Sequence, residues 1–328
     1  MESFRVVLDT DLAMGAAGSD VDDGFALALA IAEPAIDVEL ITTVGGNSDV
    51  ETSTRLTKEL LAVLGRPDIG VVRGAAAPLD PALRSASRPS ATDVNTSTDT
   101  ATATATDRDT AEPYAAVEIA RRVMAAPGEI TLVAIGPLTN VAMALLLEPR
   151  LAAAVREIVV MGGVYLEQTN VGRMPGEYNF WCDPYAADVV LNSGAPLRLV
   201  GLDVTRKVRL SRADARELAQ GGEFGMFAAE HTEAWISFQE RTKPREELEH
   251  GSCALHDPLA VAVVTHPELV TWRDAYVAVE TAGRVTRGVA IADLLMWEDP
   301  PAPNCKIATA VDAPAFRELF LQRLAALP

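Results

Sequence analysis

The sequence predicts an α/β protein with one open, doubly wound and mostly parallel sheet, flanking helices and a helical C-terminal portion. Three observations support this. Short apolar runs alternate with segments whose apolar residues recur at helical spacing, which favours βαβ units. Polar loops follow successive runs, as expected along the ligand-binding edge of such a sheet. The chain has 328 residues, 49% of them hydrophobic. It can therefore bury a large core, and we interpret residues 1–328 as a single domain.

The first strand and helix establish the pattern. Residues 6–11 form an apolar run that ends in Asp-Thr-Asp, and a loop rich in Gly, Ala and Ser covers residues 12–19. Apolar residues at helical spacing predict a helix over residues 21–32. Ser19 or Asp20 is the expected N-cap, because their side-chain oxygens accept hydrogen bonds from free backbone N–H groups.

The remaining elements continue the alternation. Strands are expected at residues 38–44, 69–72, 130–135, 157–161 and 197–202. Helices are expected at residues 49–64, 113–124, 184–191, 212–218, 224–240 and 314–324, with two more ending near residues 147 and 264. A hairpin-like pair of strands is expected at residues 275–280 and 284–291.

One segment interrupts the pattern. Residues 85–110 consist largely of Ser, Thr, Ala and Asp, and they include three consecutive Ala-Thr pairs. Such a composition offers no apolar anchor for a packed core. We therefore predict a flexible, low-complexity loop within the domain.

Composition and charge exclude several classes of function. The formal net charge is −18, which disfavours nucleic acid and anionic membranes as partners. No apolar stretch reaches membrane-spanning length, and no leader-like segment precedes the first strand. The three cysteines are widely spaced and contain no CxxC pair, so neither a disulfide framework nor a zinc site is indicated. We expect a cytoplasmic protein.

The loop after the first strand concentrates negative charge. Five carboxylates, those of Asp9, Asp11, Asp20, Asp22 and Asp23, lie within fifteen residues. Their mutual repulsion would be costly unless a cation compensated it. Oxygen-only ligands favour a hard cation, Ca²⁺ or Mg²⁺, over zinc. A solvated acidic loop with a helix cap is the alternative, but it leaves the first two carboxylates unexplained.

Several motifs, met in order along the chain, resemble those of the inosine-uridine preferring nucleoside hydrolases. They are Asp9-Thr10-Asp11 with Asp22-Asp23, Thr42-Thr43-Val44-Gly45-Gly46-Asn47, Gly136-Pro137-Leu138-Thr139-Asn140-Val141-Ala142, and Leu255-His256-Asp257-Pro258. Met161-Gly162-Gly163 and Glu177-Tyr178-Asn179 are similar to the family's remaining motif. The resemblance extends from about residue 6 to the C-terminus.

The resemblance implies a Rossmann-like sheet, one bound Ca²⁺ and hydrolysis of the N-glycosidic bond of a ribonucleoside. It implies metal ligation by Asp11, Asp23, Asp257 and the main-chain carbonyl of Ile135. It implies ribose binding by Asp22, Asn47, Asn170, Glu177 and Asn179, with Asp9 in a supporting position. It also implies a homodimer or homotetramer.

The chemistry accounts for this set of residues. Departure of the base leaves an oxocarbenium-like ribosyl group, so the enzyme must stabilise positive charge, supply water and protonate the base. Asp11 is the expected general base for the water. His256, next to a predicted metal ligand, is the expected acid for the leaving base.

Two departures from the family pattern affect the site. Residues 13–19 are an insert that separates the two acidic pairs, and it makes Asp20 a competing ligand. The low-complexity tract replaces the family's His- and Gly-rich substrate loop, so the sequence does not give the base preference. Two other functions stay open: a nucleoside- or ribose-binding protein without turnover, and an Asp-x-Asp phosphatase that uses Mg²⁺.

Several residues near the motifs are expected to be structural. Asn140 is interpreted as a structural residue. The aromatic side chains of Tyr178, Phe180, Trp181 and Trp297 are expected to pack in the core rather than to stack on a base.

Overall fold

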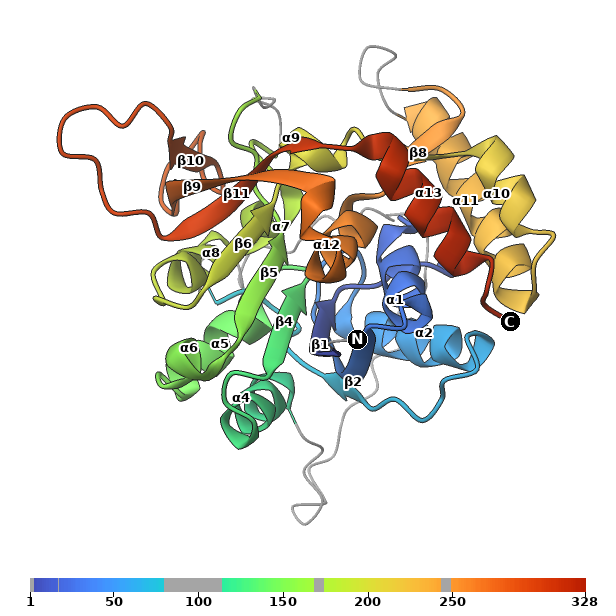
Figure 1. Ribbon diagram of the computed structural model, residues 1–328, viewed down its shortest axis with the longest axis horizontal. Helices are drawn as coiled ribbons and strands as arrows, with labels where there is room; N and C mark the ends of the chain where they lie inside the picture. The colour runs from blue at the N-terminus through green and yellow to red at the C-terminus, as the bar shows by residue number, and fades with distance from the viewer. Residues whose placement is uncertain (1–2, 17, 80–113, 168–173, 243–248) are drawn as a thin grey trace.

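The computed structural model describes residues 3–16, 18–79, 114–167, 174–242 and 249–328 (Figure 1). Its centre is a nine-stranded sheet in the order β10-β9-β11-β6-β5-β4-β1-β2-β3. The neighbouring strands from β11 to β3 are parallel, whereas β9 pairs antiparallel with both β10 and β11. The predicted α/β class with a mostly parallel sheet is confirmed.

The strands are short, as is usual in α/β proteins. The large sheet contains β1 (Phe4–Thr10), β2 (Ile36–Thr43), β3 (Val71–Arg73), β4 (Ile130–Ala134), β5 (Glu157–Met161), β6 (Leu197–Val200), β9 (Val270–Val279), β10 (Ala290–Asp293) and β11 (Cys305–Val311). A second, antiparallel sheet pairs β7 (Arg209–Ser211) with β8 (Ser252–Ala254).

The helices cover both faces of the large sheet. One face carries α1 (Asp22–Ala32), α2 (Val50–Val63), α12 (His256–Thr265) and α13 (Ala313–Leu324). The other carries α4 (Ala115–Ala125), α5 (Thr139–Leu147), α6 (Leu151–Ala154) and α8 (Pro184–Leu191). Two short helices, α7 (Tyr178–Cys182) and α9 (Leu202–Thr205), follow the strands β5 and β6.

Two separate apolar cores result from the alternation of side chains along the strands. In β1, Val6 and Leu8 pack with the first group of helices, and Val7 packs with the second. In β5, Val159 faces the first core, whereas Ile158 and Val160 face the second. Because successive strand residues point to opposite faces, buried strands read as continuous apolar runs.

The strand order reverses between β1 and β4. From β1 the chain proceeds through β2 to β3 on one side, and from β4 through β5 to β6 on the other. At such a reversal the loops after the two central strands diverge and leave a crevice at the carboxyl edge of the sheet. The acidic loop after β1 therefore starts at the place where α/β folds bind ligands.

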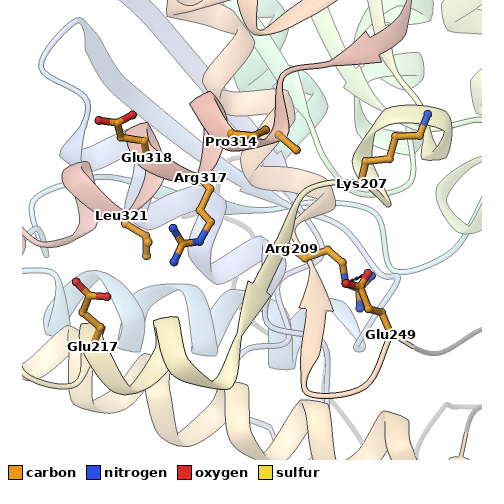
Figure 2. A pocket seen from close by; sticks show the side chains of 9 residues that line it. Lys207, Arg209, Glu217, Glu249, Pro314, Arg317, Glu318 and Leu321 are labelled. Carbon is orange, nitrogen blue, oxygen red and sulfur yellow. Dashed lines mark ion pairs between the residues drawn. The ribbon is translucent and has the colours of Figure 1, made fainter.

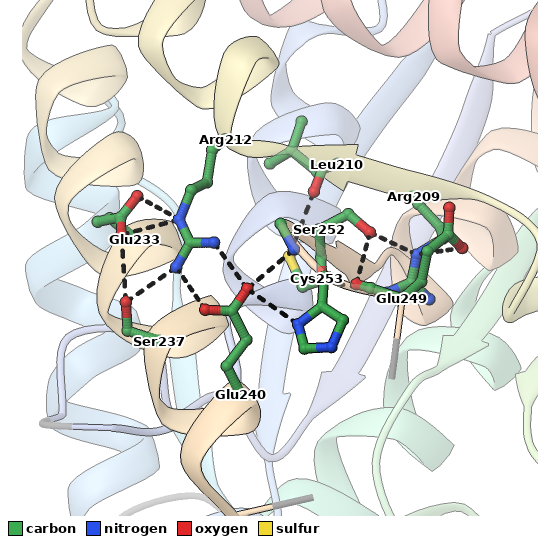
Figure 3. A network of polar contacts seen from close by, with 11 residues as sticks. Arg209, Leu210, Arg212, Glu233, Ser237, Glu240, Glu249, Ser252 and Cys253 are labelled. Atoms are coloured by element: carbon green, nitrogen blue, oxygen red, sulfur yellow. Dashed lines mark hydrogen bonds and ion pairs between the residues drawn. The ribbon is translucent and has the colours of Figure 1, made fainter. Parts of the chain in front are cut away.

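An outer helical layer supports one end of the sheet, where α10 (Arg212–Leu218) packs against α11 (Glu223–Thr242). Figure 3 shows how charge links these helices to β8. Arg212 donates to Glu233 at 2.9 Å and to Glu240 at 2.8 Å, and Glu240 accepts the Gly251 N–H at 2.9 Å. Since β8 leads directly into α12, this network holds in place the chain segment that precedes His256.

Most predicted elements are confirmed. The exceptions are three strands that were not predicted and one strand whose bounds differ from the prediction. The strands β7, β8 and β11 were not predicted, and the second strand of the expected hairpin is the shorter segment β10. Two of the missed strands have three residues each, too few to establish an alternating pattern. The low-complexity loop at residues 85–110 and the start of the helix at Pro113 lie outside the described residues.

Two local expectations were wrong. The N-cap of α1 is Val21, without a side-chain cap, because Ser19 instead donates to the carbonyls of Ala13 and Ala16. Asp20 accepts the N–H of Val21, one residue before the helix. Trp297 is 74% exposed in the segment between β10 and β11, which projects from the body at the left of Figure 1.

Candidate functional site

A cavity of about 330 Å³ opens beside the strand reversal. It is lined by two sets of residues that differ in chemistry. The acidic set consists of the lining residues Asp22, Asn47, Ile135, Glu177, Asn179 and Asp257, together with Asp11 and Asp23, which hydrogen-bond Asn47. The mixed set consists of Met174, Leu202, Arg206, Trp235 and His256. Asp20, Met161 and Tyr178 also contribute to the lining.

Three buried carboxylates form the centre of the acidic set. Asp22 and Asp23 occupy the first turn of α1, and Asp257 occupies the first turn of α12, which packs against α1. One ligand oxygen from each of the three lies within 4.8 Å of the others. Two helix N-termini thus point at one place, where their macrodipoles favour negative charge.

Burial raises the pKa of all three carboxyl groups, and repulsion from neighbouring carboxylates, Asp20 among them, raises it further. The pKa of Asp23 rises to about 6, and those of Asp22 and Asp257 rise well above their ordinary values. A divalent cation would compensate these charges, and the donors available are all oxygens. The residues present therefore fit a hard metal ion.

Asp23 is oriented from outside the cluster. The hydroxyl of Thr10 donates to its Oδ1, and the Asn47 amide donates to its Oδ2 at 3.0 Å. These hydrogen bonds favour the ionised carboxylate and partly offset the effect of burial on its pKa. Asn47 thereby connects the loop after β2 to the helix after β1.

Asp11 lies in a narrow space between two loops. Its Oδ2 accepts the backbone N–H of Asn47 at 2.6 Å. A Cβ atom at Gly46 would lie 1.7 Å from that oxygen, and one at Gly136 would lie 3.0 Å from Oδ1. Only glycine at these positions allows the carboxylate to approach the two backbones so closely. Asp11 also hydrogen-bonds Asp23, which joins it to the cluster.

The opposite part of the acidic set comes from the loop after β5. Asn179 donates to the Ile135 carbonyl at 2.8 Å and to the Met161 carbonyl at 3.1 Å. Glu177 accepts the backbone N–H groups of Gly163 and Asn179, at 3.0 and 2.7 Å. Burial nevertheless raises the pKa of Glu177. The loop is thus held against the ends of β4 and β5.

His256 joins the mixed set from the start of α12. Its Nδ1 lies 2.8 Å from the hydroxyl of Thr205, the last residue of α9. Thr205 is fully buried, so this contact fixes the orientation of the ring. His256 and Asp257 are adjacent, and both line the cavity.

A buried network lies behind the site. Asp9 accepts hydrogen bonds from Thr42 and from Asn140, the latter at 2.8 Å, while burial raises its pKa to about 7. Asn140 also donates to the Thr43 carbonyl at 2.9 Å and accepts the Ala75 N–H at 2.9 Å. The interpretation of Asn140 as structural agrees with this bracing position, which ties together the loops that follow three strands.

The structure places most of the predicted site residues together. Asp11, Asp23 and the cavity-lining residues Asp22, Asn47, Ile135, Glu177, Asn179, His256 and Asp257 surround one region. Asp20 also lines the cavity, despite the insert before it. Asn170 lies outside the described residues.

Sequence reasoning missed five lining residues, of which Leu202 was expected only as the end of a strand. Tyr178 was expected in the core, but it lines the cavity and donates to the Gly46 carbonyl at 2.9 Å. Its position between Glu177 and Asn179 was an available signal. Met174, Arg206 and Trp235 had no such signal, because their spacing to the motifs is irregular.

A second, wider hollow of about 670 Å³ lies beside α13 (Figure 2). Its basic side chains have acidic partners: Arg209 contacts Glu249 at 3.0 Å, and Arg317 pairs with Asp214. The described part of the chain places no group of three potential metal ligands there. The first cavity is therefore the stronger candidate for a reaction site.

Comparisons with known proteins show which sequences and structures this chain resembles. The sequence model of the inosine-uridine preferring nucleoside hydrolases matches residues 6–318. The chain is 34% identical over 330 residues to the non-specific ribonucleoside hydrolase RihC of Salmonella heidelberg, covering 99% of both proteins. It is 33% identical over 308 residues to the pyrimidine-specific ribonucleoside hydrolase RihA of Klebsiella pneumoniae, covering 93% of this chain and 95% of RihA.

Two solved structures share the fold along almost the whole chain. The plant nucleoside hydrolase PpNRh1 superposes with a TM-score of 0.82 at 27% identity, covering 98% of this chain and 99% of its own. A purine-preferring ribonucleoside hydrolase from Gardnerella vaginalis gives a TM-score of 0.79 at 29% identity, covering 98% of both chains. Among the helices that the structure describes, none is long and apolar enough to cross a membrane.

Proposed function

Because the chain belongs to the inosine-uridine preferring nucleoside hydrolase family and is a ribonucleoside hydrolase, we propose that the cavity beside β1 and β4 is its Ca²⁺-dependent active site. The single observation that supports this most directly is the buried cluster of Asp22, Asp23 and Asp257, of which Asp22 and Asp257 line the cavity. Such a cluster needs a cation, and its oxygen donors suit calcium.

The proposed metal ligands are Asp11, Asp23, Asp257 and the carbonyl oxygen of Ile135. Asp11 hydrogen-bonds Asp23, and the Ile135 carbonyl is directed at the Asn179 amide on the cavity wall. A carbonyl oxygen has two lone pairs, so it can accept that hydrogen bond and still bind a cation. When bound, Ca²⁺ would supply positive charge and coordination sites for water and hydroxyl oxygens.

The proposed ribose-binding residues are Asp22, Asn47, Asn170, Glu177 and Asn179. Carboxylates accept hydrogen bonds from sugar hydroxyls, and the amide side chains can both donate and accept. Glu177 and Asn179 are held by backbone contacts before any substrate arrives, which lowers the cost of ordering them on binding. Asp22 belongs to the three-carboxylate cluster as well, so it would contact the ribose next to the metal ligands.

Asp11 and His256 are the proposed catalytic pair. Asp11 takes a proton from the attacking water while the water oxygen bonds to the anomeric carbon. The bond from that carbon to the base nitrogen breaks, and its electron pair leaves with the base. His256 donates a proton to the departing base, and its contact with Thr205 holds the ring in place. The products are ribose and the free base.

The two other functions considered from the sequence fit less well. A phosphatase of the Asp-x-Asp type needs an exposed nucleophile, but Asp9 is buried and bonded to Thr42 and Asn140. A binding protein without turnover is not favoured by any feature of the cavity. Calcium, the cytoplasmic location and the homodimeric or homotetrameric state remain predictions.

The test is ribose release from a panel of purine and pyrimidine ribonucleosides, with p-nitrophenyl riboside as an easily hydrolysed substrate. We expect release that EDTA abolishes and that Ca²⁺ restores. The Asp11→Asn variant should lower kcat by about 10²- to 10⁴-fold on every substrate, since it removes the general base. The matched control is Asp312→Asn, which alters the N-cap of the distant helix α13. If the folded, calcium-loaded protein released ribose from none of these substrates, the proposal would be overturned.

A further inference from the structure

The mixed set contains an unexpected positive charge. The cavity as a whole is acidic, since Asp20, Asp22, Glu177 and Asp257 all line it. Among the described lining residues, Arg206 is the only Lys or Arg side chain. None of the sequence motifs includes it, and the proposed metal site and catalytic pair leave it without a role.

Arg206 lies beside the proposed acid. It directly follows Thr205, whose hydroxyl contacts Nδ1 of His256. Its own side chain lines the same cavity as the imidazole and as Trp235 of α11. The metal ligands and ribose contacts belong to the acidic set, so a base leaving from the ribose would meet the mixed set.

The guanidinium has donors to spare. It contacts the Glu167 carboxylate at an N–O distance of 3.5 Å, longer than the 2.7–2.9 Å that is typical of a charge-assisted hydrogen bond. Its side chain is 46% exposed, so part of the guanidinium is accessible from the cavity or from solvent. Since a guanidinium carries five N–H groups in a planar fork, most remain available to a ligand.

We propose, on the basis of the function proposed above, that Arg206 selects the leaving base and favours 6-oxopurine ribonucleosides such as inosine and guanosine. A 6-oxopurine presents O6 and N7 as adjacent acceptors, which match the two parallel donors of an arginine. Adenine presents an N6 donor in place of O6 and repels the fork. Uracil has no such adjacent pair on its exposed edge.

The same contact assists departure of the base. When the glycosidic bond breaks, its electron pair moves into the base and increases the charge on O6 and N7. The attraction between a fixed cation and those two atoms is therefore stronger in the transition state than in the ground state. Arg206 is a specificity-determining residue in this scheme, and His256 remains the proton donor.

Lys207 provides a matched control. It is the next residue, it pairs with the same Glu167 at 3.9 Å, and its side chain lines the second hollow in Figure 2. The variants Arg206→Ala and Lys207→Ala thus remove neighbouring cations with a shared partner. Only Arg206→Ala changes the lining of the proposed active site.

The experiment measures kcat/KM on inosine, adenosine and p-nitrophenyl riboside for the calcium-loaded enzyme and both variants. We expect the unaltered enzyme to prefer inosine to adenosine. Arg206→Ala should lower kcat/KM on inosine by about 10- to 100-fold, the range of one bidentate contact, and change the other two substrates by less than about 3-fold. Lys207→Ala should leave all three unchanged. Arg206→Lys keeps the charge but loses the fork, so it should also lose the preference for inosine.

The outcomes separate this inference from the function on which it rests. An equal loss on all three substrates, or a preference of the unaltered enzyme for adenosine, would overturn the role of Arg206 while leaving nucleoside hydrolysis intact. Failure of the unaltered enzyme on p-nitrophenyl riboside, which needs no base recognition, would instead overturn the proposed function.

Discussion

The acidic and mixed sets of the cavity are held in place by different means. Asp11, Asp23 and Asn179 each make hydrogen bonds to neighbouring strand-end loops, several of them to backbone atoms. Arg206 and Trp235 extend from the short helix α9 and the outer helix α11, and Arg206 makes one long ion-pair contact. The first set is preorganised, which suits a metal ion and a ribose of fixed shape. The second can change without disturbing the sheet.

This difference predicts where base preference can change within one fold. The relatives include a non-specific, a pyrimidine-specific and a purine-preferring ribonucleoside hydrolase, by their names. If the half of the site that binds ribose and metal stays the same, the enzyme catalyses the same reaction. Substitutions on α9 and α11 would then alter the base preference without a loss of stability. Variants in the acidic set should therefore affect all substrates equally, and variants in the mixed set should discriminate among them.

The largest expected effect comes from Gly46→Ala. The added Cβ would lie 1.7 Å from Oδ2 of Asp11, so the carboxylate or the loop after β2 must move. A displacement of about 1 Å in a reacting group can cost about 10²-fold in rate. We expect kcat to fall by about this factor on inosine, uridine and p-nitrophenyl riboside alike, as measured by ribose or nitrophenol release.

The control for that substitution is Gly70→Ala. At Gly70 an added Cβ meets only Leu40, at 3.7 Å, which is ordinary contact. This variant should keep its activity on every substrate. If Gly46→Ala kept full activity in a folded protein, or lost it on one base only, the acidic set would not be the rigid, base-independent half described above.

The acidic set is also the part that the sequence predicts well, for a physical reason. Asp9, Asp11, Asp22 and Asp23 lie close together in the chain, and repulsion among them demands an explanation. Asn47 follows the next strand, and the ends of parallel strands share one edge of the sheet. Asp257 is distant in sequence, so only the resemblance connected it to the others.

The strand β11 was missed although it pairs with β6 and β9, since nothing local indicates that pairing.

Apart from His256, the mixed set was not predictable in the same way. Arg206 and Trp235 belong to segments whose patterns serve helix packing, and their side chains meet only through the arrangement of α9 and α11 against the sheet. Tyr178 was assigned to the core because aromatic residues near apolar ones are usually buried. Specificity depends on such contacts between distant elements, whereas the metal cluster depends mainly on local charge density.

A loss of similar size on inosine, but selective among substrates, is expected from His256→Ala. If His256 protonates the leaving base, its loss should lower kcat/KM on inosine by about 10²-fold, the lower part of the range for general acid catalysis. p-Nitrophenyl riboside needs no protonation of its leaving group, so its rate should change by less than about 3-fold. The ratio of the two rates is the measurement. Equal losses on both substrates would mean that the imidazole acts independently of the base, like the acidic set. The distinction between the acidic and mixed sets would then fail.

The smallest effect is on stability, and it tests whether the acidic set binds the metal. Burial raises the pKa of Asp23 to about 6 and those of Asp22 and Asp257 well above their ordinary values. A carboxyl group with a raised pKa in the folded state stabilises the fold when protonated, so the metal-free protein should lose stability as the pH rises above about 4. Calcium must displace these protons, hence its stabilising effect should be small at pH 5 and grow toward pH 8. At 10³ times its Kd, calcium contributes about 4 kcal/mol, which predicts a rise in Tm of roughly 6 °C at the higher pH. Differential scanning calorimetry with EDTA or CaCl₂ at several pH values measures this rise. A calcium effect that is equal at all pH values, or one that survives in the Asp257→Asn variant, would place the metal away from this cluster.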